Sequence, residues 1–128
     1  MSDVGEQAMA TARAFIDAFN AQDHERLAGT LNYPHVRLAK GAFETIATHE
    51  DCVARSHQVA PALAEEGWDH TVVAAMEVVH EGPGKVHLAI TNHRCHADGT
   101  VYKPFDTLWV VTLQDGHWGV QFRSSYLR

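Results

Sequence analysis

The second half of the chain carries the feature that most constrains the fold. From Trp68 to Arg128, four long strand-like runs are separated by tight turns at Glu81-Gly82-Pro83-Gly84, Asp98-Gly99 and Asp115-Gly116. Asp-Gly pairs between alternating apolar residues are the strongest short-range signal of a β-hairpin. We therefore expect an antiparallel meander. A bent meander with helices on one face encloses a concavity suited to a small-molecule pocket.

The first half of the chain is predicted to be mainly helical. Apolar residues recur with a helical period over residues 4–21, which predicts an amphipathic helix there. Asp23 can cap a short second helix that ends at Gly29, and Thr48 can cap a third helix that runs to Gly67. Between these two helices the period is lost, and the alternation of Val36 and Leu38 predicts a short strand.

Composition limits the class of protein and of partner. A chain of 128 residues that is 45% hydrophobic can bury one core, so we expect a single domain over residues 1–128. The net charge of −6 and the lack of a basic run argue against nucleic-acid or membrane partners. Without a long apolar run or a basic leader, the expected location is cytoplasmic. Cys52 and Cys95 have no metal-ligand spacing and are expected to be small buried hydrophobes.

The order of these elements resembles the nuclear transport factor 2-like (NTF2-like) superfamily. Two local sequences strengthen the resemblance: Phe19-Asn20-Ala21-Gln22-Asp23, and the segment from Leu108 to Gln121, which is similar to the last hairpin of the family. The resemblance implies a cystatin-like α+β barrel, with three N-terminal helices packed on a strongly bent antiparallel sheet. The superfamily includes ketosteroid isomerases, SnoaL-type polyketide cyclases and scytalone dehydratase, so it implies many possible activities.

Histidine is the expected acid/base if the protein is an enzyme. The isomerases of this superfamily use a carboxylate after the second helix, and residues 31–43 contain no Asp or Glu. The chain has ten histidines, and a neutral histidine can exchange a proton near pH 7. We take His35 and His57 as candidate acid/base residues, Tyr33 as a candidate oxyanion donor and Asp106 as the group that orients the histidine.

The resemblance also indicates which side chains line the pocket. The candidate ligand-binding residues are Phe15, Phe19, His93, Phe105, Trp109 and Tyr126. No cofactor or metal is expected, because strand histidines six residues apart lie roughly 20 Å from each other. The interpretation is a small-molecule pocket protein, either a cofactor-free isomerase, dehydratase or cyclase of a small apolar carbonyl compound, or a non-catalytic ligand-binding or dimerisation module.

The last strand leaves one question open. Simple alternation puts Trp118, Val120, Phe122, Ser124 and Tyr126 on the face covered by helices, and Gln121 and Arg123 on the other. An inward Arg123 would anchor a carboxylate or enolate, whereas an outward one would cross a dimer interface, which the alternation favours. The run from Leu108 to Leu113 is apolar on both faces, so we expect a homodimer through the outer sheet face.

Overall fold

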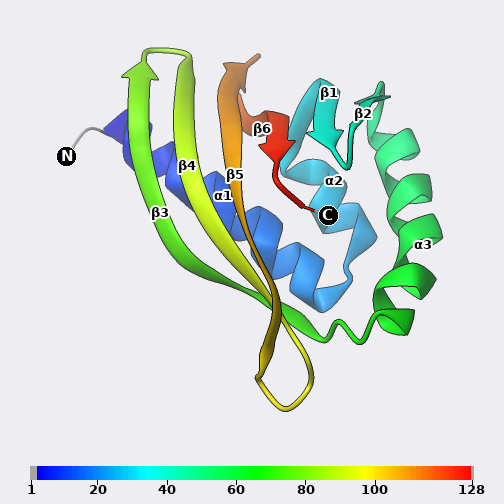
Figure 1. Cartoon of the computed structure of the whole chain (residues 1–128). Coiled ribbons are helices and arrows are strands. Elements are labelled where there is room, and N and C mark those ends of the chain that lie inside the picture. Colours follow the sequence, from blue (N-terminus) through cyan, green and yellow to red (C-terminus); the bar gives the residue numbers. More distant parts are fainter. Residues whose placement is uncertain (1–2, 128) are drawn as a thin grey trace.

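The computed structural model describes residues 3–127 and has three helices against one curved sheet (Figure 1). The elements, in chain order, are α1 (Asp3–Ala21), α2 (His24–Gly29), β1 (Leu31–Ala39), β2 (Ala42–Ile46), α3 (His49–Glu65), β3 (His70–Gly82), β4 (Lys85–Cys95), β5 (Val101–Gln114) and β6 (His117–Ser125). The expected α+β class is confirmed. Within the described range, no helix is both long and apolar enough to cross a membrane.

The sheet contains the predicted meander and a parallel pairing that the sequence did not reveal. Its strand order is β2-β1-β6-β5-β4-β3, and β3 to β6 pair antiparallel in succession. The hairpin turns fall at Asp98-Gly99 and Asp115-Gly116, as predicted. However, β1 pairs with β6 in parallel. Local turn signals could not predict this pairing, because about eighty residues of chain separate the two strands.

The helix boundaries follow the capping signals. The side chain of Asp23 accepts a hydrogen bond from the Arg26 amide at the start of α2, and that of Thr48 accepts one from the Asp51 amide at the start of α3. The short strand predicted after α2 is longer than expected and continues into β2. Lys40 and Gly41 turn the chain with φ of 55° and 73°. A lysine in that position is a weak turn signal, which is why the sequence did not predict this hairpin.

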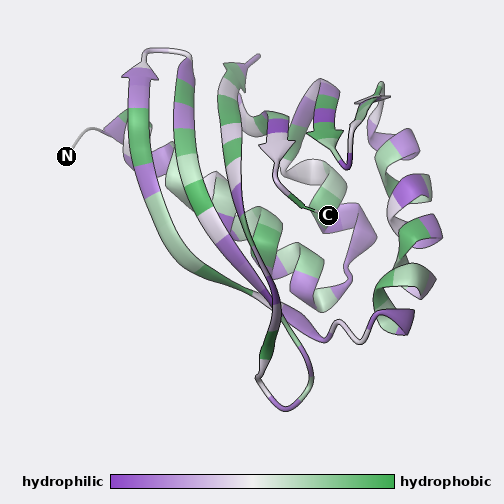
Figure 2. Cartoon of the chain, in the orientation of Figure 1, coloured by the Kyte–Doolittle hydropathy of each residue, from purple (hydrophilic) through white to green (hydrophobic). Residues whose placement is uncertain are grey.

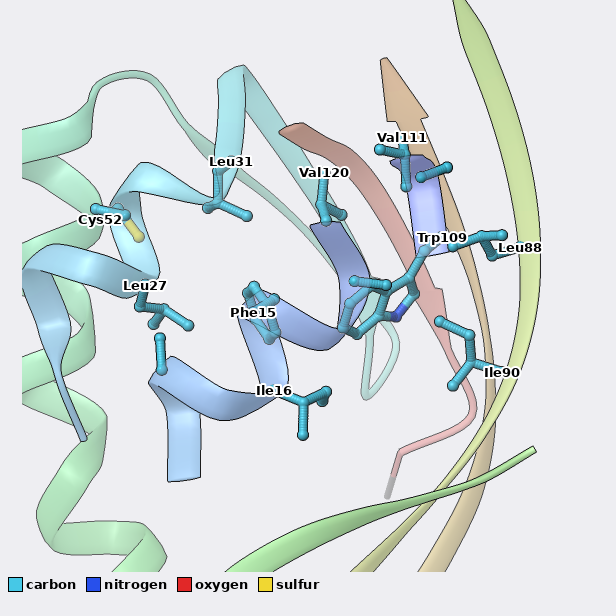
Figure 3. Packing of buried hydrophobic residues seen from close by; sticks show 14 of the residues in the cluster. Phe15, Ile16, Leu27, Leu31, Cys52, Leu88, Ile90, Trp109, Val111 and Val120 are labelled. Carbon is cyan, nitrogen blue, oxygen red and sulfur yellow. The ribbon is translucent and has the colours of Figure 1, made fainter. Parts of the chain in front are cut away.

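The core lies between α1 and the concave face of the meander. Figure 3 shows Phe15 and Ile16 of α1 pointing toward Leu88, Ile90 and Trp109 on β4 and β5. The Phe15 and Trp109 rings meet edge to face, with centroids 4.9 Å apart. Burying each such side chain contributes roughly 1.5–3 kcal/mol. Along the long strands hydrophobic and hydrophilic residues alternate, so one face of the sheet packs on α1 and the other stays partly polar (Figure 2).

The two cysteines are small buried residues in this core. Cys52 lies on α3 and Cys95 at the end of β4, and both are free thiols. This confirms the interpretation drawn from their spacing.

Candidate functional site

Beside the core, two adjoining hollows between α1, α3 and the sheet form an interior cavity. The first, the aromatic hollow, has a volume of about 50 Å³ and is walled by Phe15, Phe105 and Trp109. The second, the cationic hollow, has a volume of about 180 Å³ and is bounded by α3. Both hollows share the side chains of Phe19, Arg37, Arg94, Arg123 and Leu127.

A β-bulge in β6 turns Arg123 into this cavity. Val120 pairs with Val111, but Phe122 pairs with the adjacent residue Val110, so Gln121 is an extra residue in the ladder. Val120 and Arg123 therefore share the inner face, although they are three residues apart. The sequence interpretation, which followed unbroken alternation and favoured an outward Arg123, is wrong for this part of the strand.

His35 holds Arg123 in place. Its Nδ1 is 2.9 Å from the carbonyl oxygen of Val120, and its Nε2 is 3.0 Å from Nε of Arg123. A carbonyl only accepts and a guanidinium only donates, so Nδ1 carries the proton and Nε2 is an acceptor. Burial, and then the charge of Arg123, lowers the pKa of His35 to about 3. At neutral pH His35 is thus uncharged, and both of its ring nitrogens are occupied.

The guanidinium of Arg123 faces the cavity without a carboxylate partner among residues 3–127. It lies over the Phe15 ring, 4.8 Å from the centroid, which is a favourable cation–π position. Burial, followed by the charges of Arg37 and Arg55, lowers the pKa of Arg123 to about 9. The group therefore stays mainly protonated at pH 7, as a charge that is costly to bury unpaired.

The glutamates of the site are bound to other cations. Glu44 receives two hydrogen bonds from Arg55, of 2.6 and 2.9 Å, in the bidentate geometry that suits a guanidinium and a carboxylate. Glu66, which caps α3, accepts from Arg94 at 2.9 Å and from the Tyr102 hydroxyl at 2.6 Å. These contacts fix Arg55 and Arg94 at the cavity wall, and they leave Arg123 without an anionic partner among residues 3–127.

Asn92 supplies a further polar group to the aromatic hollow. It is 2% exposed, and its Oδ1 is buried without a hydrogen-bond partner among the described residues. A buried acceptor without a donor costs about 1–3 kcal/mol. Such a group at the wall of a cavity is a polar contact that a bound molecule could complete.

Four of the predicted site residues line the cavity: Phe15, Phe19, Phe105 and Trp109. His35 lies behind the wall, buried under Arg123. Tyr33 is turned away from the cavity, because its hydroxyl donates to the Ala28 carbonyl at 2.7 Å. The expected grouping of Tyr33 with a catalytic histidine is therefore not found.

The remaining predicted residues lie outside the cavity. His57 is on the exposed side of α3, where its ring contacts His24 at 4.0 Å between centroids. Asp106 and His93 fall on the outer face of the meander, because they alternate with inward residues of β5 and β4. Asp106 accepts a hydrogen bond from Thr91 there, and Tyr126 is 79% exposed. The resemblance indicated that these strands line the cavity, but it did not indicate which face of each strand points inward.

Sequence reasoning missed Arg37, Arg55, Asn92 and Arg94. A signal existed for three of them. Arg37 follows His35 by two residues on a strand, so an inward His35 implies an inward Arg37. On β4 the buried positions Val86, Leu88 and Ile90 predict that Asn92 and Arg94 continue the same face. No comparable pattern indicated Arg55 on α3, because a residue beside the apolar face of a helix can point toward either of the elements that flank the helix.

Three helices on one curved sheet, with a cavity between them, define the class as a cystatin-like α+β fold. Residues 6–122 match the model of a family described as NTF2-like protein (DUF6841). The chain therefore belongs to this NTF2-like family, which confirms the resemblance seen in the sequence. No sequence match to a curated protein was found.

Solved structures share the fold at low sequence identity. A ketosteroid isomerase-like protein from Erwinia carotovora atroseptica superposes with a TM-score of 0.74 at 16% identity, covering 99% of this chain and 98% of that one. An NTF2-like protein from Cytophaga hutchinsonii gives 0.73 at 16% identity and covers 100% of both chains. A protein of unknown function with a cystatin-like fold from Nostoc punctiforme gives 0.75 at 10% identity, covering 100% and 94%. At these identities the likeness concerns the fold.

Proposed function

We propose that this protein binds a small organic anion in the interior cavity, with Arg123 as its anchor. The observation that carries the proposal is the unpaired Arg123 guanidinium, which is held by His35 and lies against Phe15. A half-buried cation without a counter-charge among the described residues is stabilised when a ligand supplies one. The bond to His35 uses Nε, so the Nη groups are free to bind a carboxylate.

The size and walls of the cavity describe the rest of the ligand. A cavity of about 150 Å³ lined by apolar side chains holds benzene. The cationic hollow, at about 180 Å³ and next to the aromatic hollow, suits a body of one ring or a short branched chain. Phe19, Phe105 and Trp109 supply apolar contacts for that body. The ligand proposed here differs from the purely apolar compound inferred from the sequence by its anionic group.

Binding without catalysis is the function that the geometry supports best. A histidine acid/base would need a free ring nitrogen in the cavity, and both nitrogens of His35 are engaged while His57 is exposed outside it. The carboxylate Glu66 is held by Arg94, Lys103 and Tyr102, so it is a poor base. One observation favours the alternative of a cofactor-free isomerase, dehydratase or cyclase: the Arg123 guanidinium is a group that can stabilise an enolate oxygen.

Titration calorimetry with matched probes tests the proposal. Benzoate carries the anionic group, and benzyl alcohol has a similar size without the charge. We expect measurable binding of benzoate and at least tenfold weaker binding of benzyl alcohol, since charged hydrogen bonds contribute about 1.5–3 kcal/mol. Arg123→Gln should reduce benzoate affinity by a similar factor.

Arg13→Gln is the matched control. Arg13 is exposed on α1, so this substitution removes one arginine charge outside the cavity. Circular dichroism would verify that both variants are folded. Equal affinities for the two probes, or unchanged benzoate affinity in Arg123→Gln, would contradict the proposal.

A further inference from the structure

Arg37 and Arg123 are directly opposite each other on neighbouring strands. They are register partners in the parallel ladder of β1 and β6, so their side chains project from the same face of the sheet into the cavity. Like charges directly across a ladder destabilise a sheet. The arrangement becomes favourable when an anion lies between the two arginines.

Arg37 is also poorly neutralised. Its one ion pair within the described part of the chain is to Glu44, at 4.0 Å, and that carboxylate already receives two hydrogen bonds from Arg55. The Arg37 side chain is 17% exposed, so water screens its charge only in part. Four arginines border the cavity. Glu44 balances the charge of Arg55 and Glu66 that of Arg94, so the positive charges of Arg37 and Arg123 are left.

We infer that the ligand is a dianion, with its negative charge shared between Arg123 and Arg37. This inference rests on the proposed function, and it specifies the charge of the ligand. Two carboxylates on one small body, or a single phosphate monoester, have the same charge and suit the same pair of guanidiniums. Lys40 at the turn after β1 adds a further cation at the rim of the cationic hollow.

Non-specific electrostatics would act against such a ligand. The chain carries a net charge of −6, so its long-range field repels a dianion more than a monoanion. Tighter binding of a dianion therefore requires a local positive site. The cavity holds five of the ten Lys and Arg residues of the chain in its walls.

Calorimetry with three probes tests the inference: benzoate as the monoanion, isophthalate as the dicarboxylate and phenyl phosphate as the monoester, at pH 7.5 and low salt. We expect at least one dianion to bind about tenfold more tightly than benzoate, from an additional charged hydrogen-bonded pair. The dianion that binds more tightly than benzoate shows whether the site recognises two carboxylates or one phosphate. Arg37→Gln should abolish the preference, so that neither dianion binds more tightly than benzoate.

Arg13→Gln should keep the preference unchanged. Without ligand, Arg37→Gln should be as thermally stable as the wild-type protein or more stable, because it removes the repulsion across the ladder. Benzoate binding with no gain for either dianion would overturn this inference and leave the proposed function intact. A preference that survives in Arg37→Gln would also overturn it. Failure of all three anions to bind would instead reject the proposed function.

Discussion

His35, a candidate acid/base from the sequence, lies in the fold as a buried contact of Arg123. The resemblance to the NTF2-like superfamily drew attention to it, because the strand after α2 lines the concavity in that superfamily. Its chemistry depends on two partners, the Val120 carbonyl and Arg123, that are more than eighty residues away in the chain. In this environment His35 is a neutral acceptor that positions Arg123.

The pH dependence of stability tests this neutral state. In the unfolded chain His35 titrates near 6.5, and in the folded protein its pKa is about 3. Between these values the unfolded state binds the proton that the folded state rejects, so the free energy of unfolding falls as pH is lowered from 6.5 toward 3. The slope from one such group is at most about 1.4 kcal/mol per pH unit.

Urea denaturation of the wild-type protein and of His35→Gln at pH 7.5, 6.5, 5.5 and 5 measures the effect. The pKa values of His24 and His87 are also lowered, mainly by burial, and both residues are present in the two proteins, so the difference between the two curves isolates His35. The variant should lose less stability on acidification. Parallel curves would mean that His35 is not kept neutral by the fold.

At the scale of the elements, the junction of β1 and β6 positions the site. It brings His35 and Arg37 next to Arg123, and it depends on a close approach at Gly119. The helices and the meander were predictable, because capping residues and Asp-Gly turns act locally. The parallel pairing and the bulge at Gln121 were not, because they depend on contacts distant in sequence. The sequence therefore predicted a concavity between the helices and the sheet, but it did not predict which polar side chains face the cavity.

Gly119→Ala should destabilise this junction. A Cβ at Gly119 would lie 2.6 Å from the Asn32 amide nitrogen and 2.6 Å from the Leu31 carbonyl carbon, both backbone atoms that cannot move without shifting β1. We expect a loss of roughly 1–3 kcal/mol in the free energy of unfolding, as for other overpacked sites. Gly84→Ala is the control, since no atom lies within 4 Å of its Cβ and it should have little effect. Equal stability of the two variants in urea denaturation would show that the close approach at Gly119 does not stabilise the junction of β1 and β6.

At the scale of the whole molecule, the outer face of the meander remains uncovered by helices. On this face, Val72 and Leu108 expose 45% and 38% of their surface. His93 and Asp106, which the sequence had suggested for the pocket, lie on this same face. We propose that a second copy of the chain covers it, as the apolar pattern of β5 led us to expect, in an interface of about 800 Å² per partner.

Sedimentation equilibrium tests the homodimer. Leu108→Lys places a charge in the middle of the proposed interface and should shift the protein toward monomer by at least tenfold in dissociation constant, because an unpaired charge would be buried. Ala10→Lys, on the exposed side of α1, should leave association unchanged. A wild-type protein that is monomeric at micromolar concentration would argue decisively against this assembly.

The most direct test of the binding site observes the arginine side chains themselves. Two-dimensional ¹H–¹⁵N spectra resolve the Nε–H groups of arginines, and the Arg123 signal is assigned by its loss in Arg123→Gln. On titration with benzoate or isophthalate, the Arg123 signal should shift in a saturable manner, while those of the exposed Arg13 and Arg26 remain in place. Shifts confined to Arg13 and Arg26, or no saturable shift at Arg123, would contradict the assignment of this cavity as an anion-binding site.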